Sequence, residues 1–189
     1  MSDETQVTIS PVTAEDFASH LEGLSALLHA CVHAGANINF VLPFSEADAE
    51  DFWTAKVLPP LRVGTRLLWI ARLDGRIAGS VQLDIDTPPN QPHRAEVAKL
   101  LVHPDFRRRG LARALMADLE RHAKALGRTL ITLDTRTGDN AEPLYASLGY
   151  RTAGIIPAFC LDPIDRSLHP TTIMYKELAA ARHCRGRPE

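Results

Sequence analysis

The distribution of apolar residues along the chain predicts alternating helices and strands. Apolar residues recur about every four positions over 17–32 and again over 111–126, the spacing that places them on one helix face. Shorter apolar runs rich in β-branched residues predict strands over 7–10, 66–73, 76–85, 95–102, 129–134, 151–156 and 172–178. Further helices are predicted to begin near residues 45 and 140.

Turn residues set the predicted boundaries. Asp74-Gly75 predicts a hairpin between two strands. The helix that begins near residue 45 is predicted to end at about residue 57, because Pro59-Pro60 follows. The interval 157–170 is rich in turn residues and is predicted to be a loop that covers an active site.

The order of the elements predicts the fold class. A strand over 95–102, a helix and a strand over 129–134 form a right-handed unit whose two strands are parallel. With the hairpin and the closing strands, this predicts an α/β fold with a mixed central sheet of about seven strands and flanking helices. We expect one domain over 1–180 and a short basic tail over 181–189.

The composition of the chain argues against functions that depend on nucleic acid or on a membrane. An apolar content of 45% and a net charge of −2 give no reason to expect binding to nucleic acid or to a membrane surface. No apolar run is long enough to span a bilayer, and the acidic N-terminal segment is not typical of a signal peptide. The three widely spaced cysteines favour reduced thiols and a cytoplasmic location.

A basic segment separates the strand over 95–102 from the helix that begins at residue 111. A helix N-terminus presents unpaired N–H groups and a positive dipole end, which bind phosphate. Gly110 lets the backbone approach a ligand, and the arginines at 107–109 add positive charge. The segment therefore predicts a polyphosphate site, with a solvated helix start as the alternative. Neither the glycine pattern of dinucleotide folds nor that of phosphate-loop NTPases occurs.

The pattern Arg-x-x-Gly-x-Ala, placed after a strand and opening a helix, resembles the acetyl-CoA pyrophosphate loop of the GNAT (Gcn5-related) N-acetyltransferases. The resemblance implies the GNAT fold, in which the fourth and fifth strands splay apart and admit acetyl-CoA, the acyl donor. The residues it implies for binding acetyl-CoA are Leu101, Val102, Arg107, Arg108, Arg109, Gly110, Leu111, Ala112, Arg113 and Asn140.

Two carboxylates are candidates for the amine chemistry. An amine with an ordinary pKa is protonated at neutral pH, and removing that proton costs about 4–5 kcal/mol near pH 7. Glu96 begins one strand and Asp134 ends the adjacent parallel strand, so both can reach the cleft between them. The alternatives are that Glu96 pairs with Arg94 or Lys99 and that Asp134 caps the following loop.

Tyr145 is the third catalytic candidate. The segment 140–150 resembles the GNAT segment in which an asparagine holds the cofactor arm and a tyrosine points at the thioester sulfur. The resemblance implies that the Tyr145 phenol protonates the departing thiolate. Packing of this side chain against Leu144 and Leu148 is the alternative.

Several further residues are candidates for the acceptor site. These are His33, Asn37, Phe40 and His169. His29 and His33 have a spacing that a metal could use, but no third ligand is near, so no metal is expected. Nothing around Cys160 indicates a lowered thiol pKa, which favours direct transfer over an acyl-enzyme.

Within the GNAT family the chain is most similar to the tabtoxin-resistance acetyltransferases, which inactivate a β-lactam-containing amino-acid toxin. The similar segments are 27–40, 94–116, 133–135, 141–150 and 168–171. In that subgroup the acids that correspond to Glu96 and Asp134 have been put forward as catalytic. The chain departs from the family pattern at Ala112, where a second glycine is common, and in the loop 136–140.

The prediction is therefore a cytoplasmic N-acetyltransferase that acts on the amine of a small molecule, with toxin resistance as one role. The alternatives are a protein or peptide N-acetyltransferase and a catalytically silent acyl-CoA sensor. Binding of nucleic acid through the arginines at 107–109 is a weaker reading. A homodimer is expected only because GNAT proteins are often dimers.

Overall fold

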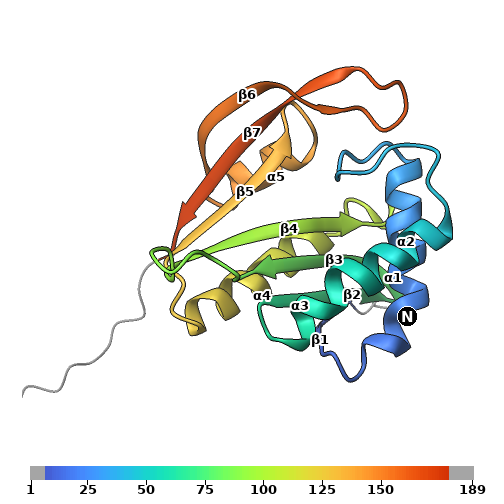
Figure 1. Ribbon diagram of the computed structural model, residues 1–189, viewed down its shortest axis with the longest axis horizontal. Coiled ribbons are helices and arrows are strands. Elements are labelled where there is room, and N and C mark those ends of the chain that lie inside the picture. The colour runs from blue at the N-terminus through green and yellow to red at the C-terminus, as the bar shows by residue number, and fades with distance from the viewer. Residues whose placement is uncertain (1–6, 179–189) are drawn as a thin grey trace, which may run out of the picture.

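The computed structural model describes residues 7–178, which form one seven-stranded sheet flanked by helices (Figure 1). The strand order is β1-β2-β3-β4-β5-β7-β6. The strands are β1 (Val7–Val12), β2 (Arg66–Leu73), β3 (Arg76–Asp84), β4 (Arg94–Val102), β5 (Leu130–Arg136), β6 (Arg151–Leu161) and β7 (Leu168–Glu177). The expected tail over 181–189 lies outside the described residues.

Helices cover both faces of the sheet (Figure 1). The longest are α1 (Phe17–His33) and α4 (Leu111–Ala125). Between β1 and β2 the chain also forms α2 (Glu46–Phe52), a π-helical turn (Trp53–Val57) and α3 (Leu58–Arg62), and α5 (Ala141–Ser147) follows β5. A 3₁₀ turn (Pro104–Phe106) leads from β4 toward α4. No helix within 7–178 is long and apolar enough to cross a bilayer.

The alternation of side chains along β2 separates two hydrophobic cores. Leu68 and Ile70 face the core that α1, α2 and the π-helical turn complete. Trp69 and Ala71 face the other core, to which α4 contributes Leu115 among other residues. The sheet is thus buried on both faces at β2, as the order of helices and strands predicted, whereas the edge strand β6 is exposed along most of its length.

The hairpin predicted at Asp74-Gly75 is present. Both residues have positive φ, 50° and 77°, which is the backbone of the tight turn that joins antiparallel strands. β2 and β3 pair from Arg66↔Asp84 to Leu73↔Arg76, and the Arg66 guanidinium forms an ion pair with Asp84 at the open end.

The predicted end of the second helix at about residue 57 is wrong. The capping box of Ser45 and Asp48 starts the helix as expected, but helical backbone continues to Arg62. The reason is that Leu58 begins a new turn, α3, in which Pro59 and Pro60 occupy early positions where their missing N–H groups are not needed.

The prediction of a long loop over 157–170 is also wrong. β6 continues to Leu161 and β7 begins at Leu168, so only a short turn separates them. The proline at 157 is accommodated because the β6–β7 register shifts between Ile156 and Cys160, so this stretch of β6 lies outside the regular ladder.

β4 and β5 are parallel neighbours that separate along their length (Figure 1). Their pairing covers only Arg94–Glu96 of β4 and Leu130–Thr132 of β5. Beyond those pairs each strand continues without the other, and the two strand ends diverge. This divergence places a cavity inside the sheet.

Candidate active site

A cavity of about 440 Å³ lies where β4 and β5 diverge. Its walls come from the segment after α1, from β4, from the start of α4, from β5 and from α5. The candidate site residues that line it are Asn37, Glu96, Leu101, Val102, Arg107, Ala112, Asp134, Asn140 and Tyr145. Residues far apart in the sequence are thus brought to one site.

The basic segment forms the N-terminal end of α4. Gly110 occupies the N-cap position with φ of 80°, a conformation that glycine adopts without strain. Arg107 and Ala112 line the cavity. No side chain caps the first N–H groups of α4, so the helix start presents donors that a phosphate could accept.

The other residues predicted for the pyrophosphate lie outside the cavity lining. Arg109 stacks over Phe106, with its guanidinium carbon 5.7 Å from the ring centre. Leu111 is buried in the core, and Arg113 donates a 2.8 Å hydrogen bond to the Ser147 hydroxyl of α5. Gly110 and Arg108 are exposed at the surface.

β4 carries a bulge beside the cavity. Ser80 pairs with Leu101 and Gln82 pairs with Ala98, so β4 has one residue more than β3 in this stretch. Lys99 has a φ of 50° there, which is uncommon for a residue other than glycine. A bulge takes backbone groups out of the ladder, which makes them available to a ligand.

Leu101 and Val102, at the end of β4, line the cavity. The carbonyl of Val102 accepts a hydrogen bond from the Cys31 thiol at 3.5 Å. Burial raises the pKa of Cys31 to about 11, so this thiol stays protonated and structural.

Glu96 and Asp134 face the same cavity from the two diverging strands. Glu96 forms an ion pair with Arg94 at 3.2 Å and keeps about half of its side chain exposed. Asp134 accepts a 3.4 Å hydrogen bond from the Thr171 hydroxyl and is likewise exposed to solvent. Both carboxylates are accessible to a ligand, and Glu96 also makes the pair with Arg94 that the alternative interpretation described.

Tyr145 is buried and lines the cavity from α5. Burial raises the pKa of its phenol well above the ordinary value, and the negative charge of Asp134 raises it further. Its ring also contacts Tyr150, with ring centres 5.7 Å apart. The phenol is therefore protonated at neutral pH, in the cavity that Glu96 and Asp134 also line.

The four residues predicted for the acceptor have different surroundings. Asn37 lines the cavity and donates to the Cys160 sulfur at 3.0 Å. Phe40 packs against Phe44 and Phe52, outside the cavity lining. His33 is exposed, and its Nε2 atom forms a 2.8 Å hydrogen bond with the Phe44 carbonyl. Like Phe40, His33 is not part of the cavity lining.

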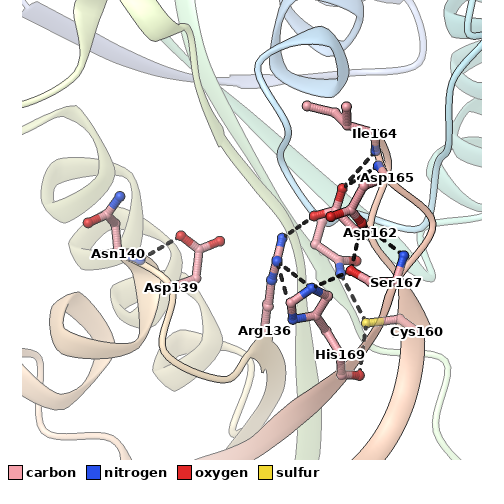
Figure 2. Close-up of polar contacts among 10 residues, drawn as sticks. Arg136, Asp139, Asn140, Cys160, Asp162, Ile164, Asp165, Ser167 and His169 are labelled. Atoms are coloured by element: carbon pink, nitrogen blue, oxygen red, sulfur yellow. Dashed lines mark hydrogen bonds and ion pairs between the residues drawn. The ribbon is translucent and has the colours of Figure 1, made fainter.

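His169 belongs to a polar network at the hairpin of β6 and β7 (Figure 2). Arg136 lines the cavity, and its guanidinium forms an ion pair with the Asp162 carboxylate at 2.7 Å. The same guanidinium forms a 2.8 Å hydrogen bond with Nε2 of the His169 ring. Backbone N–H groups of Ile164 and Asp165 also donate to Asp162, and these bonds lower the pKa of its carboxyl.

The hairpin turn also contacts the loop that follows α1. The Leu42 N–H donates to the Pro163 carbonyl at 2.9 Å, and Arg166 donates to the Leu42 carbonyl. Together with the bond from Asn37 to Cys160, these contacts join two segments across one end of the cavity. The cavity is therefore bordered by strands on two sides and bridged by loops at one end.

Lys99 and Arg136 line the cavity but were not predicted as site residues. For Arg136 a signal existed, since it follows Asp134 by two positions on a strand and alternation places both on one face. For Lys99 there was none, because its orientation depends on the bulge in β4.

Comparison with known proteins agrees with this architecture. The profile of the acetyltransferase (GNAT) family matches residues 34–150. An uncharacterised N-acetyltransferase of Azospirillum brasilense is 35% identical over 59% of this chain and 66% of its own length. An acetyltransferase of Pectobacterium atrosepticum is 38% identical over 48% of this chain and 61% of its own length. The chain thus spans about two thirds or less of these relatives.

Solved structures share the fold at low identity. An N-acetyltransferase from Staphylococcus aureus superposes with a TM-score of 0.71 at 16% identity, covering 92% of this chain and 99% of that one. A Salmonella typhimurium protein solved with its cofactor acetyl-CoA has a TM-score of 0.71 at 18% identity, covering 94% and 96%. The predicted fold class is confirmed.

Proposed function

The chain belongs to the acetyltransferase (GNAT) family, and we propose that it moves an acetyl group from acetyl-CoA to the amine of a small molecule. Acetyl-CoA is the acyl donor of this family. The observation that carries the proposal is that Glu96, Asp134 and Tyr145 line one cavity together with the start of α4. Transfer would be direct, with donor and acceptor bound together.

The donor side of the proposal uses backbone groups as well as charge. The uncapped N-terminal end of α4 and Arg107 would hold the pyrophosphate. The divergent end of β4, at Leu101 and Val102, would bind the pantetheine arm as a strand binds its neighbour. Backbone N–H groups near the bulge would polarise the thioester carbonyl, and the Asn140 side chain, which makes no cap bond, would hold the arm from α5.

The acceptor side of the proposal uses the two carboxylates. Either Glu96 or Asp134 would accept the amine proton, directly or through water, because a protonated amine has no lone pair to attack with. They line the cavity from two neighbouring strands, so an amine bound in the cavity would have a carboxylate on either strand to accept its proton. The nitrogen then forms a bond to the acetyl carbon as the carbon–sulfur bond breaks.

Tyr145 would protonate the leaving thiolate. We expect Tyr145→Phe to lower kcat by about 10- to 100-fold with little change in the KM for acetyl-CoA, because only the proton donor is lost. Steady-state kinetics at saturating acceptor measures this. Tyr175→Phe, a tyrosine of β7 outside the cavity lining, should match wild type. An unchanged kcat in Tyr145→Phe would assign the packing role instead.

A small acceptor is supported by the bridge between the loop after α1 and the hairpin of β6 and β7. A protein or peptide acceptor needs an open groove, and the contact from Leu42 to Pro163 crosses the place where such a groove would run. A β-lactam amino acid of the tabtoxin kind is one acceptor that fits this proposal. Peptide acetylation and a silent acyl-CoA sensor are the competing functions.

The test is CoA release from acetyl-CoA, followed with a thiol reagent. The amines compared are amino acids, polyamines, aminoglycosides, β-lactam amino acids and peptides. Release with a small amine and none with peptides supports the proposal. Release with peptides alone favours the protein acetyltransferase. Tight acetyl-CoA binding with no release from any amine favours the sensor.

The proposal extends to location and assembly. Cys31 and Cys160 are free thiols in the structure, which suits a reducing cytoplasm. The edge strand β6 exposes Ile155, Ile156 and Phe159, and its outer backbone groups face no neighbouring strand within 7–178. Such an edge supports a homodimer, which sedimentation velocity would detect.

A further inference from the structure

Lys99 is a cation in the cavity that the proposed chemistry leaves unused. Its side chain is half-buried and lines the cavity from β4. Within residues 7–178 its ammonium group makes no hydrogen bond and no ion pair. The other two cations of the lining have roles: Arg136 is bonded to Asp162 and His169, and Arg107 lies at the start of α4.

The position of Lys99 is fixed by its surroundings. The Nζ atom lies 5.6 Å from the ring centre of Phe40 and 5.9 Å from that of Phe52, so two aromatic rings hold the cation. Its backbone has a φ of 50° at the bulge of β4. A strained conformation of this kind persists only where the surrounding structure enforces it, and such residues cluster at functional sites.

Asp134 attracts the Lys99 ammonium group, but no carboxylate within residues 7–178 forms an ion pair with it. Burial, assisted by the positive charge of Arg66 on β2, lowers the pKa of Lys99 to about 8 against the attraction of Asp134 on β5. The group is still mainly cationic at pH 7. A half-buried cation without an ion-pair partner is costly, and an anionic group of a ligand would offset that cost.

We propose that Lys99 binds a carboxylate of the acceptor, so that the substrate is an amine that also bears an acid, as amino acids do. This inference rests on the proposed function, because it names the acceptor of the same site. The amine would lie between Glu96 and Asp134 while the carboxylate reaches Lys99 on the same cavity wall as Glu96. The two acids repel a carboxylate from the amine position, which fixes the orientation.

Matched substrate pairs test this inference. Each L-amino acid is compared with its primary amide, which keeps the amine and the side chain but removes the negative charge. We expect wild type to prefer the acid by about 100-fold in kcat/KM, mainly through KM. The amide also lowers the pKa of the neighbouring amine, so a larger fraction of that amine is unprotonated at neutral pH. This effect favours the amide, so a measured preference for the acid would underestimate the contribution of the carboxylate.

Two variants separate charge from packing. Lys99→Met keeps a long unbranched side chain against the two rings but carries no charge, so the ratio of acid to amide should fall to near one. Lys99→Arg should retain a preference of about 10-fold, since it keeps the cation. Lys124→Met, an exposed lysine of α4, is the matched control and should keep the wild-type ratio.

The outcomes distinguish this inference from the function on which it rests. Equal use of acids and amides by wild type overturns the role of Lys99 but leaves the acetyltransferase proposal in place. The same holds if Lys99→Met lowers activity equally on both members of every pair, which would make Lys99 a base or a structural residue. No CoA release from any amine would overturn both.

Discussion

Asp134→Asn is expected to lower kcat by about 100-fold or more while leaving acetyl-CoA affinity within about twofold of wild type. Asparagine has nearly the same shape as aspartate but does not take a proton from an amine at neutral pH. The carboxylate is accessible in the cavity and bonds only weakly to Thr171, so the substitution removes little structure. Glu96→Gln tests the same role on the neighbouring strand, β4. This substitution also removes the ion pair between Glu96 and Arg94.

Measuring the two variants and their combination identifies the principal base. If one acid acts alone, its variant should carry nearly the whole loss, and the second substitution should add little. Asp51→Asn, an exposed carboxylate of α2, is the matched control. Full activity of both single variants on the true acceptor would refute the assignment of Glu96 and Asp134.

Gly79→Ala is expected to destabilise the protein by about 2–3 kcal/mol. A Cβ atom at residue 79 would lie 2.8 Å from the Leu101 carbonyl oxygen and 3.2 Å from a methyl group of Leu115. The first of these contacts is to backbone, so β3 and β4 would have to separate at the stretch proposed to bind the donor. Urea unfolding measures the loss of stability, and calorimetry should show weaker acetyl-CoA binding.

Gly154→Ala provides the matched control for that experiment. It is also a strand glycine, in β6, and an added Cβ would meet no atom within 4 Å. We expect its stability to lie within about 0.5 kcal/mol of wild type. A Gly79→Ala protein as stable as Gly154→Ala would show that the strands adjust without strain.

Local signals were sufficient for much of the fold and for part of the candidate site. Asp74-Gly75 predicted its hairpin because both turn positions need a backbone that these residues adopt easily. The parallel order of β4 and β5 predicted that Glu96 and Asp134 would lie at one cleft, and both line the cavity. Their catalytic roles stay predictions.

The features that sequence reasoning missed depend on contacts between distant segments. Pro59-Pro60 predicts the end of a helix. However, the indole N–H of Trp53, in the preceding turn, is buried and donates a hydrogen bond to the Leu24 carbonyl of α1, which holds the segment against that helix. The strand pairing up to Leu161 depends on Leu168, its partner in β7. Neither partner is visible in the local pattern.

The divergence of β4 and β5 also affects how the binding of one ligand in the cavity would influence the binding of another. Three residue pairs join the two parts of the sheet on one side of the cavity, and the contact of Leu42 with Pro163 joins them on the other. Any molecule that spans the cavity and binds both parts must favour one separation of the strands over others. If donor and acceptor bind in this cavity as proposed, both affinities depend on the width of the gap between β4 and β5. Each ligand would then change the affinity for the other by the same factor.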